Sequence, residues 1–84
     1  MPKNRDAEKR AIVRRDGPAC FYCGRPRRNP LLMTIEHLEA RALGGANRLD
    51  NLRLADPLCN KFAGRRSVAE KLELRAKWHM ADGL

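Results

Sequence analysis

The tetrapeptide Thr-Ile-Glu-His at residues 34–37 sets a carboxylate beside an imidazole at the end of an apolar, partly alternating run. The run begins at residue 31, and its Leu, Met, Thr and Ile predict a β-strand over 31–37. A shorter alternating run at 52–54 predicts a partner strand, so residues 38–50 would form the loop of a hairpin. Because loops of this length are commonly functional, the acid and the histidine at its start are candidate site residues.

A helix competes with the first strand. Residues 36–43 are good helix formers, and the Gly44-Gly45 pair that follows looks like a helix stop. Residue propensity alone would therefore place His37 in a helix.

Helices are expected before and after the hairpin. Residues 5–15 predict an N-terminal helix that ends at the Gly-Pro pair of residues 17–18. A Ser-Val-Ala-Glu capping box at 67–70 predicts the start of a last helix over 68–81.

A short helix is also predicted directly after the second strand. Asp56, followed by proline, is a natural N-cap, and Gly64 ends the helix. Leu58 and Phe62 are four residues apart and share its apolar face, whereas Asn60 points elsewhere.

The chain has 84 residues, a formal charge of +8 and a pI of about 10.3, with 43% hydrophobic but only 5% aromatic residues. One small domain over residues 1–84 is expected, with a modest core that a metal or a partner helps to stabilise. A chain this basic favours a polyanion as partner, either nucleic acid or an anionic membrane surface. No apolar run approaches the ~18 residues of a membrane span. The charged start without an apolar segment behind it predicts no secretion signal and a cytoplasmic location.

The three cysteines are Cys20, Cys23 and Cys59. An odd number without a secretion signal argues against a disulfide framework and for metal binding. Cys20 and Cys23 are two residues apart and closed by Gly24, which is typical of a metal-binding knuckle. A buried free thiol is the alternative for Cys59.

These features together resemble the HNH endonucleases, which belong to the ββα-metal (His-Me finger) nucleases. The resemblance covers roughly residues 7–66, and it is specific because separate pieces fall in the right order with compatible gaps. It implies an α+β fold with a ββα-metal core over about 18–66, flanking helices, and a histidine at the end of the first strand. The matching pieces are Cys20-x-x-Cys23, Ile35-Glu36-His37, Gly44-Gly45, Asp50-Asn51-Leu52-Arg53-Leu54-Ala55 and Cys59-Asn60-x-x-x-Gly64.

Phosphodiester cleavage needs a nucleophile, charge stabilisation at phosphorus and help for the leaving oxygen. A neutral imidazole can take a proton from water near pH 7, so His37 fits the general base. The carboxylate of Glu36 and the amide oxygen of Asn60 suit a divalent cation, Mg²⁺ or Mn²⁺ first, with Ni²⁺ or Zn²⁺ as further candidates. By resemblance, Asn51 braces the loop and accepts a hydrogen bond from the ring of His37.

The chain departs from the family pattern at two places. Glu36 stands where Asp is more frequent, and strict strand alternation sends Glu36 and His37 to opposite faces. The second Cys-x-x-Cys pair of the family reads Asp56-x-x-Cys59 here. Zinc bound by this carboxylate and the three cysteines is one interpretation, and a metal-free or weakly bound knuckle is the other, since Asp56 is also the natural N-cap of the next helix.

The excess of basic side chains predicts a DNA-contacting surface, although a merely solvated surface is the simpler interpretation. The candidate contacts are Arg25, Arg27, Arg28, Arg41, Lys61, Arg65 and Arg66. The sequence therefore predicts a metal-dependent DNA endonuclease that is a monomer or a weak dimer and has no membrane partner. The alternatives are a zinc-knuckle module that binds nucleic acid without cutting it, and a phage DNA-packaging factor that is active only with a terminase or another packaging protein.

Overall fold

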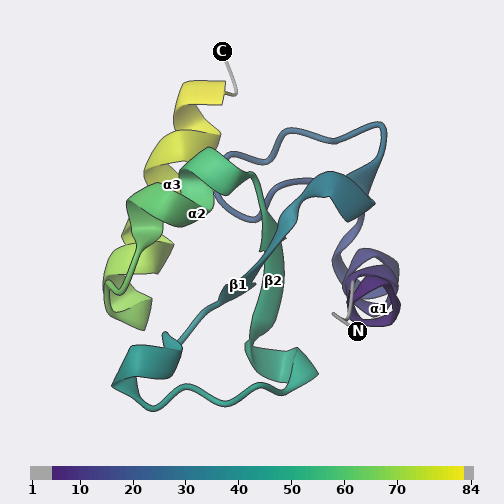
Figure 1. Ribbon diagram of the computed structural model, residues 1–84. Coiled ribbons are helices and arrows are strands. Elements are labelled where there is room, and N and C mark those ends of the chain that lie inside the picture. The colour runs from purple at the N-terminus through teal and green to yellow at the C-terminus, as the bar shows by residue number, and fades with distance from the viewer. Residues whose placement is uncertain (1–4, 83–84) are drawn as a thin grey trace.

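Two short antiparallel strands form the centre of the molecule (Figure 1). A computed structural model describes residues 5–82 of the chain. The elements follow in the order α1 (Asp6–Asp16), β1 (Thr34–His37), β2 (Leu52–Ala55), α2 (Pro57–Ala63) and α3 (Val68–Asp82). Helix α1 lies on one side of the hairpin, and helices α2 and α3 lie on the other. The predicted α+β fold is confirmed.

His37 is the last residue of strand β1, so the strand assignment is confirmed and the competing helix over 36–43 is wrong. In the antiparallel register Glu36 pairs with Arg53, and His37 pairs with Leu52. Neighbouring side chains of a strand point to opposite faces, so Glu36 and His37 leave the sheet in opposite directions.

Strand β1 is shorter than the predicted run over 31–37. Residues Pro30–Leu32 form a 3-10 turn instead. The side chain of Asn29 accepts a hydrogen bond from the Leu31 amide at 3.2 Å, and proline suits the first position of the turn. This local bonding competes with extension of the strand toward its N-terminal side.

The core lies between helix α1 and the hairpin and continues under the knuckle. Ile12 of α1 is 1% exposed, and Leu52 and Leu54 of β2 are 0% and 2% exposed. Tyr22 is fully buried between the elements, where its ring meets the ring of Trp78 edge-to-face at 5.6 Å. Tyr22 and Trp78 thus join the core to helix α3.

The helix ends follow the sequence signals. Gly17 stops α1 with a positive φ of 87°, and its amide donates to Val13 O at 2.7 Å. The capping box before α3 is complete, because the Ser67 amide donates to Glu70 Oε1 at 2.9 Å and the Glu70 amide donates to Ser67 Oγ at 3.2 Å. Within the described residues no helix is long and apolar enough to cross a membrane.

The apolar side chains of helix α2 are exposed. The sequence pairs Leu58 with Phe62 on one apolar face, but these residues are 77% and 68% exposed. This apolar face therefore lies at the surface rather than in the core. Helix α2 instead contributes Ala63, which is fully buried, and turns its longer apolar side chains to the surface.

The loop between the strands is tightly folded. Gly44 has a positive φ of 95°, and it ends a 3-10 turn over Arg41–Leu43 rather than a full helix. Gly45 approaches the chain so closely that a Cβ atom there would lie 1.7 Å from the carbonyl oxygen of Glu39. The Gly-Gly pair thus shapes this loop by two different means, one conformational and one steric.

Candidate functional site

The carboxylate of Glu36 is buried and held by two donors. The residue is 4% exposed, and its Oε2 accepts a hydrogen bond from the Tyr22 hydroxyl. The same oxygen forms an ion pair with Lys71 Nζ of helix α3 at 3.3 Å. Burial and the hydrogen bond to Glu36 raise the pKa of Tyr22 well above its usual value, so the phenol stays a donor. No described residue is hydrogen-bonded to the second oxygen, Oε1.

The amide of Asn60 is fixed against strand β1. Its Nδ2 donates to Thr34 Oγ1 at 2.9 Å and to the carbonyl oxygen of Ile35 at 3.2 Å. A backbone carbonyl only accepts, so the amide nitrogen must face the strand and Oδ1 must face away from it. Asn60 thus contacts strand β1 directly before Glu36 through its amide nitrogen, and its oxygen has no hydrogen-bond partner among the described residues.

The imidazole of His37 is held through one ring nitrogen. Its Nε2 lies 3.1 Å from Asn47 Oδ1, and that oxygen also accepts a hydrogen bond from the Arg5 guanidinium at 3.0 Å. A guanidinium only donates, so this Asn47 atom is an acceptor and Nε2 must carry the hydrogen. The lone pair then lies on Nδ1, which can accept a proton.

Asn51 braces the loop, as the resemblance implies. Its Oδ1 accepts from the Glu39 amide at 2.8 Å, and its Nδ2 donates to the carbonyl oxygens of Glu39 at 3.0 Å and Ala46 at 2.8 Å. Both ends of the side-chain amide are thus occupied by the loop backbone. The ring contact that we expected of Asn51 is made by Asn47 instead.

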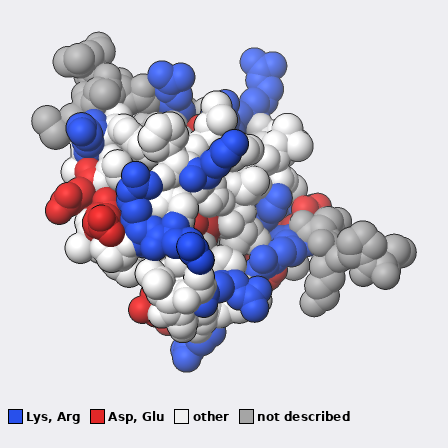
Figure 2. All heavy atoms as spheres, turned by 60° about the vertical axis from the view of Figure 1, so that its left-hand side comes forward, with Lys and Arg blue, Asp and Glu red and all other residues white. Residues whose placement is uncertain are grey.

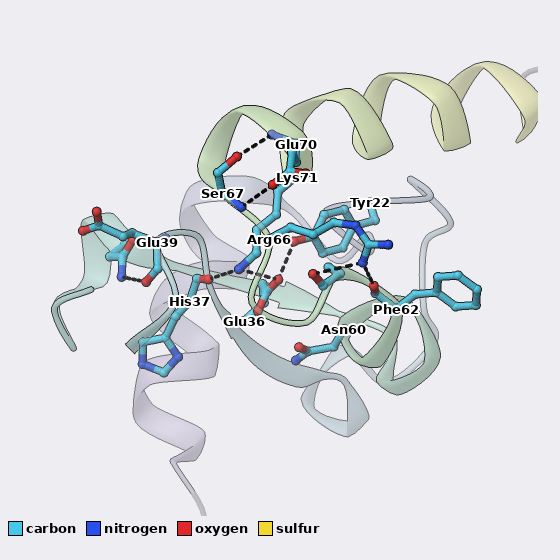
Figure 3. Close-up of polar contacts among 12 residues, drawn as sticks. Tyr22, Glu36, His37, Glu39, Asn60, Phe62, Arg66, Ser67, Glu70 and Lys71 are labelled. Carbon is cyan, nitrogen blue, oxygen red and sulfur yellow. Dashed lines mark hydrogen bonds and ion pairs between the residues drawn. The ribbon is translucent and has the colours of Figure 1, made fainter. Parts of the chain in front are cut away.

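The predicted catalytic groups come from the end of strand β1 and from helix α2. In Figure 3 the imidazole of His37 and the amide of Asn60 lie below this carboxylate, whereas Lys71 and Tyr22 approach it from above. The donor set fits a hard divalent cation, because Glu36 Oε1 and Asn60 Oδ1 are both oxygens without a hydrogen bond from a described residue.

The three cysteines and Asp56 form a compact cluster at the open end of the hairpin, directly after β2 ends at Ala55. One ligand atom from each of the four residues lies within 4.8 Å of the other three. Cys20 is 1% exposed, and none of the cysteines forms a disulfide. Three thiols and a carboxylate at this spacing suit a tetrahedral ion such as Zn²⁺, so these residues could hold a structural metal.

The thiol cluster is buried enough to resist ionisation on its own. Burial, together with the neighbouring thiols, raises the pKa of Cys59 to about 12, and burial also raises the pKa of Cys23. A thiol binds metal as the thiolate, so a cation must displace these protons.

Asp56 belongs to this cluster rather than to the helix cap. Its Oδ2 accepts a hydrogen bond from Cys23 Sγ at 3.5 Å, and its Oδ1 forms an ion pair with Arg27. It stands at the N-cap position of α2, but its side chain makes no capping hydrogen bond. The side chain of Asp56 therefore does not cap helix α2, although the residue occupies the predicted N-cap position.

The basic residues predicted to contact DNA are all exposed. Figure 2 shows Lys and Arg side chains distributed over the face that carries helices α2 and α3. Two of the predicted contacts have structural partners, because Arg27 pairs with Asp56 and Arg66 donates to the carbonyl oxygen of Phe62 at the end of α2. Among the described residues, no hydrogen bond or ion pair engages the side chains of Arg28, Arg41, Lys61 and Arg65.

Three residues around the site escaped the sequence analysis. Tyr22 lies between the two knuckle cysteines, and Asn47 lies in a loop where asparagine is common. Lys71 had a readable signal, because it shares the stripe of Leu74 and Trp78 on helix α3, with spacings of three and seven residues. A lysine on an apolar stripe indicates a buried ionic partner.

The comparisons with known proteins agree with this geometry. Residues 20–66 match a family profile described as HNH endonuclease, which is more than half of the chain. A search among curated proteins and one among solved structures found no match. The match includes both strands, helix α2, the thiol cluster and the three candidate residues Glu36, His37 and Asn60. With its ββα-metal fold, this chain belongs to the HNH endonuclease family.

Proposed function

We propose that this chain is a metal-dependent endonuclease that hydrolyses phosphodiester bonds of DNA. The observation that carries the proposal is the fixed imidazole of His37, whose Nε2 faces Asn47 Oδ1 at 3.1 Å. A protein that only bound nucleic acid would not need a histidine ring fixed by a hydrogen bond at Nε2, with Nδ1 left available to accept a proton. Family membership supports a nuclease, and the charge of +8 supports a polyanionic substrate.

Each side chain of the site has a distinct role in this reaction. His37 Nδ1 takes a proton from the attacking water, while the hydrogen on Nε2 stays on the ring and is donated to Asn47 Oδ1. Glu36 Oε1 and Asn60 Oδ1 would hold the divalent cation, Mg²⁺ or Mn²⁺. When bound, that cation supplies the positive charge that stabilises the phosphate and the departing 3′ oxygen. The products would carry a 5′-phosphate and a 3′-hydroxyl.

Two further groups of residues support the reaction from outside. Asn51 holds the loop that carries Asn47 through its bonds to Glu39 and Ala46. A zinc ion held by Cys20, Cys23, Asp56 and Cys59 would fix the knuckle to the start of helix α2. The unpaired basic side chains would hold the DNA backbone without reading its sequence.

A second candidate function is a factor that cuts only with a partner, such as a phage packaging or terminase protein. The ion pair between Glu36 and Lys71 favours it, because a carboxylate with a bound cationic side chain is less open to metal. A module that binds nucleic acid and never cuts it, even with a partner, is the remaining alternative.

A plasmid-cleavage assay tests the main proposal. Supercoiled plasmid is incubated with the purified protein and Mg²⁺ or Mn²⁺, and nicked and linear products are measured on a gel. We expect wild-type protein to cut and His37→Ala to lose at least about 10²-fold in rate, with DNA affinity retained in a gel shift. His79→Gln is the matched control, because this histidine lies on helix α3, where its Nδ1 is 3.0 Å from the carbonyl oxygen of Arg75. Equal cutting by wild type and His37→Ala would overturn the proposed base, and a gel shift without any cutting would favour a binding module.

A further inference from the structure

Lys71 is a buried cation that reaches the candidate active site from outside the family match. It lies on helix α3, beyond the matched residues 20–66, and is 0% exposed. Its Nζ donates to the carbonyl oxygen of His37 at 2.7 Å and lies 3.3 Å from Glu36 Oε2. A lysine is almost never fully buried without such partners, so its position is set by the site.

The contacts divide the Glu36 carboxylate into two functional halves. Tyr22 and Lys71 both meet Oε2, which leaves Oε1 without a described hydrogen-bond partner. Figure 3 shows Lys71 and Tyr22 on one side of the carboxylate and Asn60 on the other. The protein thus holds the carboxylate by one oxygen and leaves the other without a described hydrogen-bond partner, with Asn60 on the side opposite Lys71 (Figure 3).

The charges of the site cancel before any cation arrives. Glu36 carries one negative charge and Lys71 one positive charge, while the Asn60 amide is neutral. The other acids drawn close by do not add to this set. Glu70 is turned to the Ser67 amide at 2.9 Å, and Figure 3 shows the Glu39 side chain directed away from Glu36. A hard divalent cation is bound mainly through the charge of its oxygen ligands, so this set alone binds it weakly.

We propose that Lys71 makes cation binding and DNA binding interdependent, an inference that rests on the proposed nuclease function. The protein supplies one oxygen whose charge is already balanced and one neutral oxygen. The scissile phosphate of the DNA supplies the missing negative charge. The cation therefore enters its site together with DNA, and by thermodynamic reciprocity it strengthens DNA binding by the same factor. Lys71 is a positioning residue in this scheme, because it acts through Glu36 and the backbone of His37.

The coupling is measured as cation affinity with and without DNA, in a protein that binds but does not cut. His37→Ala serves as this background, because Lys71 contacts the backbone carbonyl of residue 37 and not its side chain. Binding of Mn²⁺ to the zinc-saturated protein is followed by electron paramagnetic resonance, alone and with a short DNA duplex in excess. We expect DNA to tighten Mn²⁺ binding by about tenfold or more. Equal Mn²⁺ affinity with and without DNA would overturn the inference.

Two matched variants in the same background separate charge from hydrogen bonding. Lys71→Met removes the cation, so Mn²⁺ binding without DNA should tighten by about tenfold and the gain from DNA should shrink. Tyr22→Phe removes a neutral donor from the same oxygen, Oε2, and should keep the gain from DNA. Lys71→Arg keeps the positive charge and should also keep the gain in Mn²⁺ affinity from DNA. Coupling that persists in Lys71→Met would overturn the role of Lys71, and coupling lost in Lys71→Arg would do the same. If Lys71→Met does not fold, the arginine variant and the comparison with and without DNA decide the inference.

The plasmid assay with wild-type protein keeps the two proposals apart. Cutting by wild type together with uncoupled Mn²⁺ binding would refute the role of Lys71 and leave the nuclease intact. Coupled Mn²⁺ binding without any cutting would refute the nuclease and leave a site in which cation and DNA bind together.

Discussion

The carboxylate of Asp56 faces the thiol of Cys23 across 3.5 Å, although Asp56 stands where a helix-capping residue would face the helix amides. The backbone amide of Asp56 also donates to Cys20 Sγ at 3.3 Å. This residue therefore joins the start of α2 to the knuckle by both its side chain and its backbone. An acid in place of the fourth cysteine of the family pattern is thus built into the cluster.

The first prediction concerns zinc at this cluster. Purified wild-type protein should contain stoichiometric zinc by elemental analysis. Cys20→Ser should lose most of it and melt at least about 10 °C lower, since each kcal/mol shifts the midpoint by roughly 4–8 °C in a domain of this size. Asp56→Asn keeps the shape of the side chain but not its charge. Its zinc content and melting temperature should lie between those of wild type and Cys20→Ser. A wild type without zinc, or a Cys20→Ser variant with unchanged melting, would contradict a structural metal.

The second prediction concerns pH. Because burial and the neighbouring thiols raise the pKa of Cys59 to about 12, zinc must displace protons that the thiols hold at neutral pH. Zinc affinity should therefore fall as pH is lowered, and binding near pH 7 should release protons. Titration calorimetry in buffers of different ionisation enthalpy measures this release. An observed heat that is independent of the buffer would contradict it.

The third prediction separates two adjacent arginines. Arg28→Ala should lower the slope of log affinity against log salt by about 0.9 without changing thermal stability, as expected for one lost phosphate contact. Arg27 pairs with Asp56, so Arg27→Ala should lower thermal stability and zinc retention. Fluorescence-polarisation titrations with a DNA duplex at several salt concentrations measure the slope, and calorimetric melting measures stability. Identical behaviour of the two variants would contradict the assignment.

The fourth prediction concerns the orientation of the His37 imidazole in the proposed reaction. Asn47→Leu removes the acceptor that faces His37 Nε2 and should lower the cleavage rate at least about tenfold, because the ring can then rotate or change tautomer. Asn47→Asp keeps an acceptor and should restore much of the rate. Single-turnover cleavage of a labelled duplex measures both. If leucine and aspartate have the same effect, the hydrogen bond does not orient the ring.

The fifth prediction concerns the start of helix α3. Ser67→Ala should destabilise the fold by about 1 kcal/mol, because it removes the oxygen that caps the Glu70 amide. Hydrogen bonds from Ser67 lower the pKa of Glu70, so the contribution of this carboxylate is present above the ordinary glutamate pKa of about 4.3 and is lost as pH falls below it. Denaturant unfolding at pH 7 and pH 3 should therefore show a difference between wild type and Glu70→Gln only at pH 7. A difference of equal size at both pH values would contradict the charged cap.

Local signals in the sequence were enough for the elements and for part of the site. Proline and glycine punctuation, the capping box and the alternation of Leu52 with Leu54 predict the helices and the second strand to within about two residues. The position of His37 was ambiguous, because residues 36–43 are good helix formers and pairing with β2 overrides that preference. The pair of Cys20 and Cys23 followed from cysteine spacing, whereas Cys59 was assigned to the cluster through the family resemblance. The placement of the Asp56 side chain could not be predicted, because one carboxylate suits both a cap and a metal.

Contacts between distant parts of the chain could not be predicted in the same way. Lys71 and Glu36 are 35 positions apart, and nothing in the sequence before or after either residue encodes the angle between α3 and the hairpin. The partner of the His37 ring depends on how the loop folds back, and this fold depends on Asn51 and Gly45. Residues that serve the site through the tertiary structure therefore escape a reading of the local sequence.

The steric crowding at Gly45 affects how mutational scans of such a small HNH domain are interpreted. A side chain at this position would collide with the Glu39 carbonyl, so nearly every replacement should distort the loop that carries Asn47. Loss of activity at position 45 would then rank with loss at position 37, although glycine has no functional group to contribute. Sensitivity to substitution is thus no guide to chemistry here unless folding is scored in parallel.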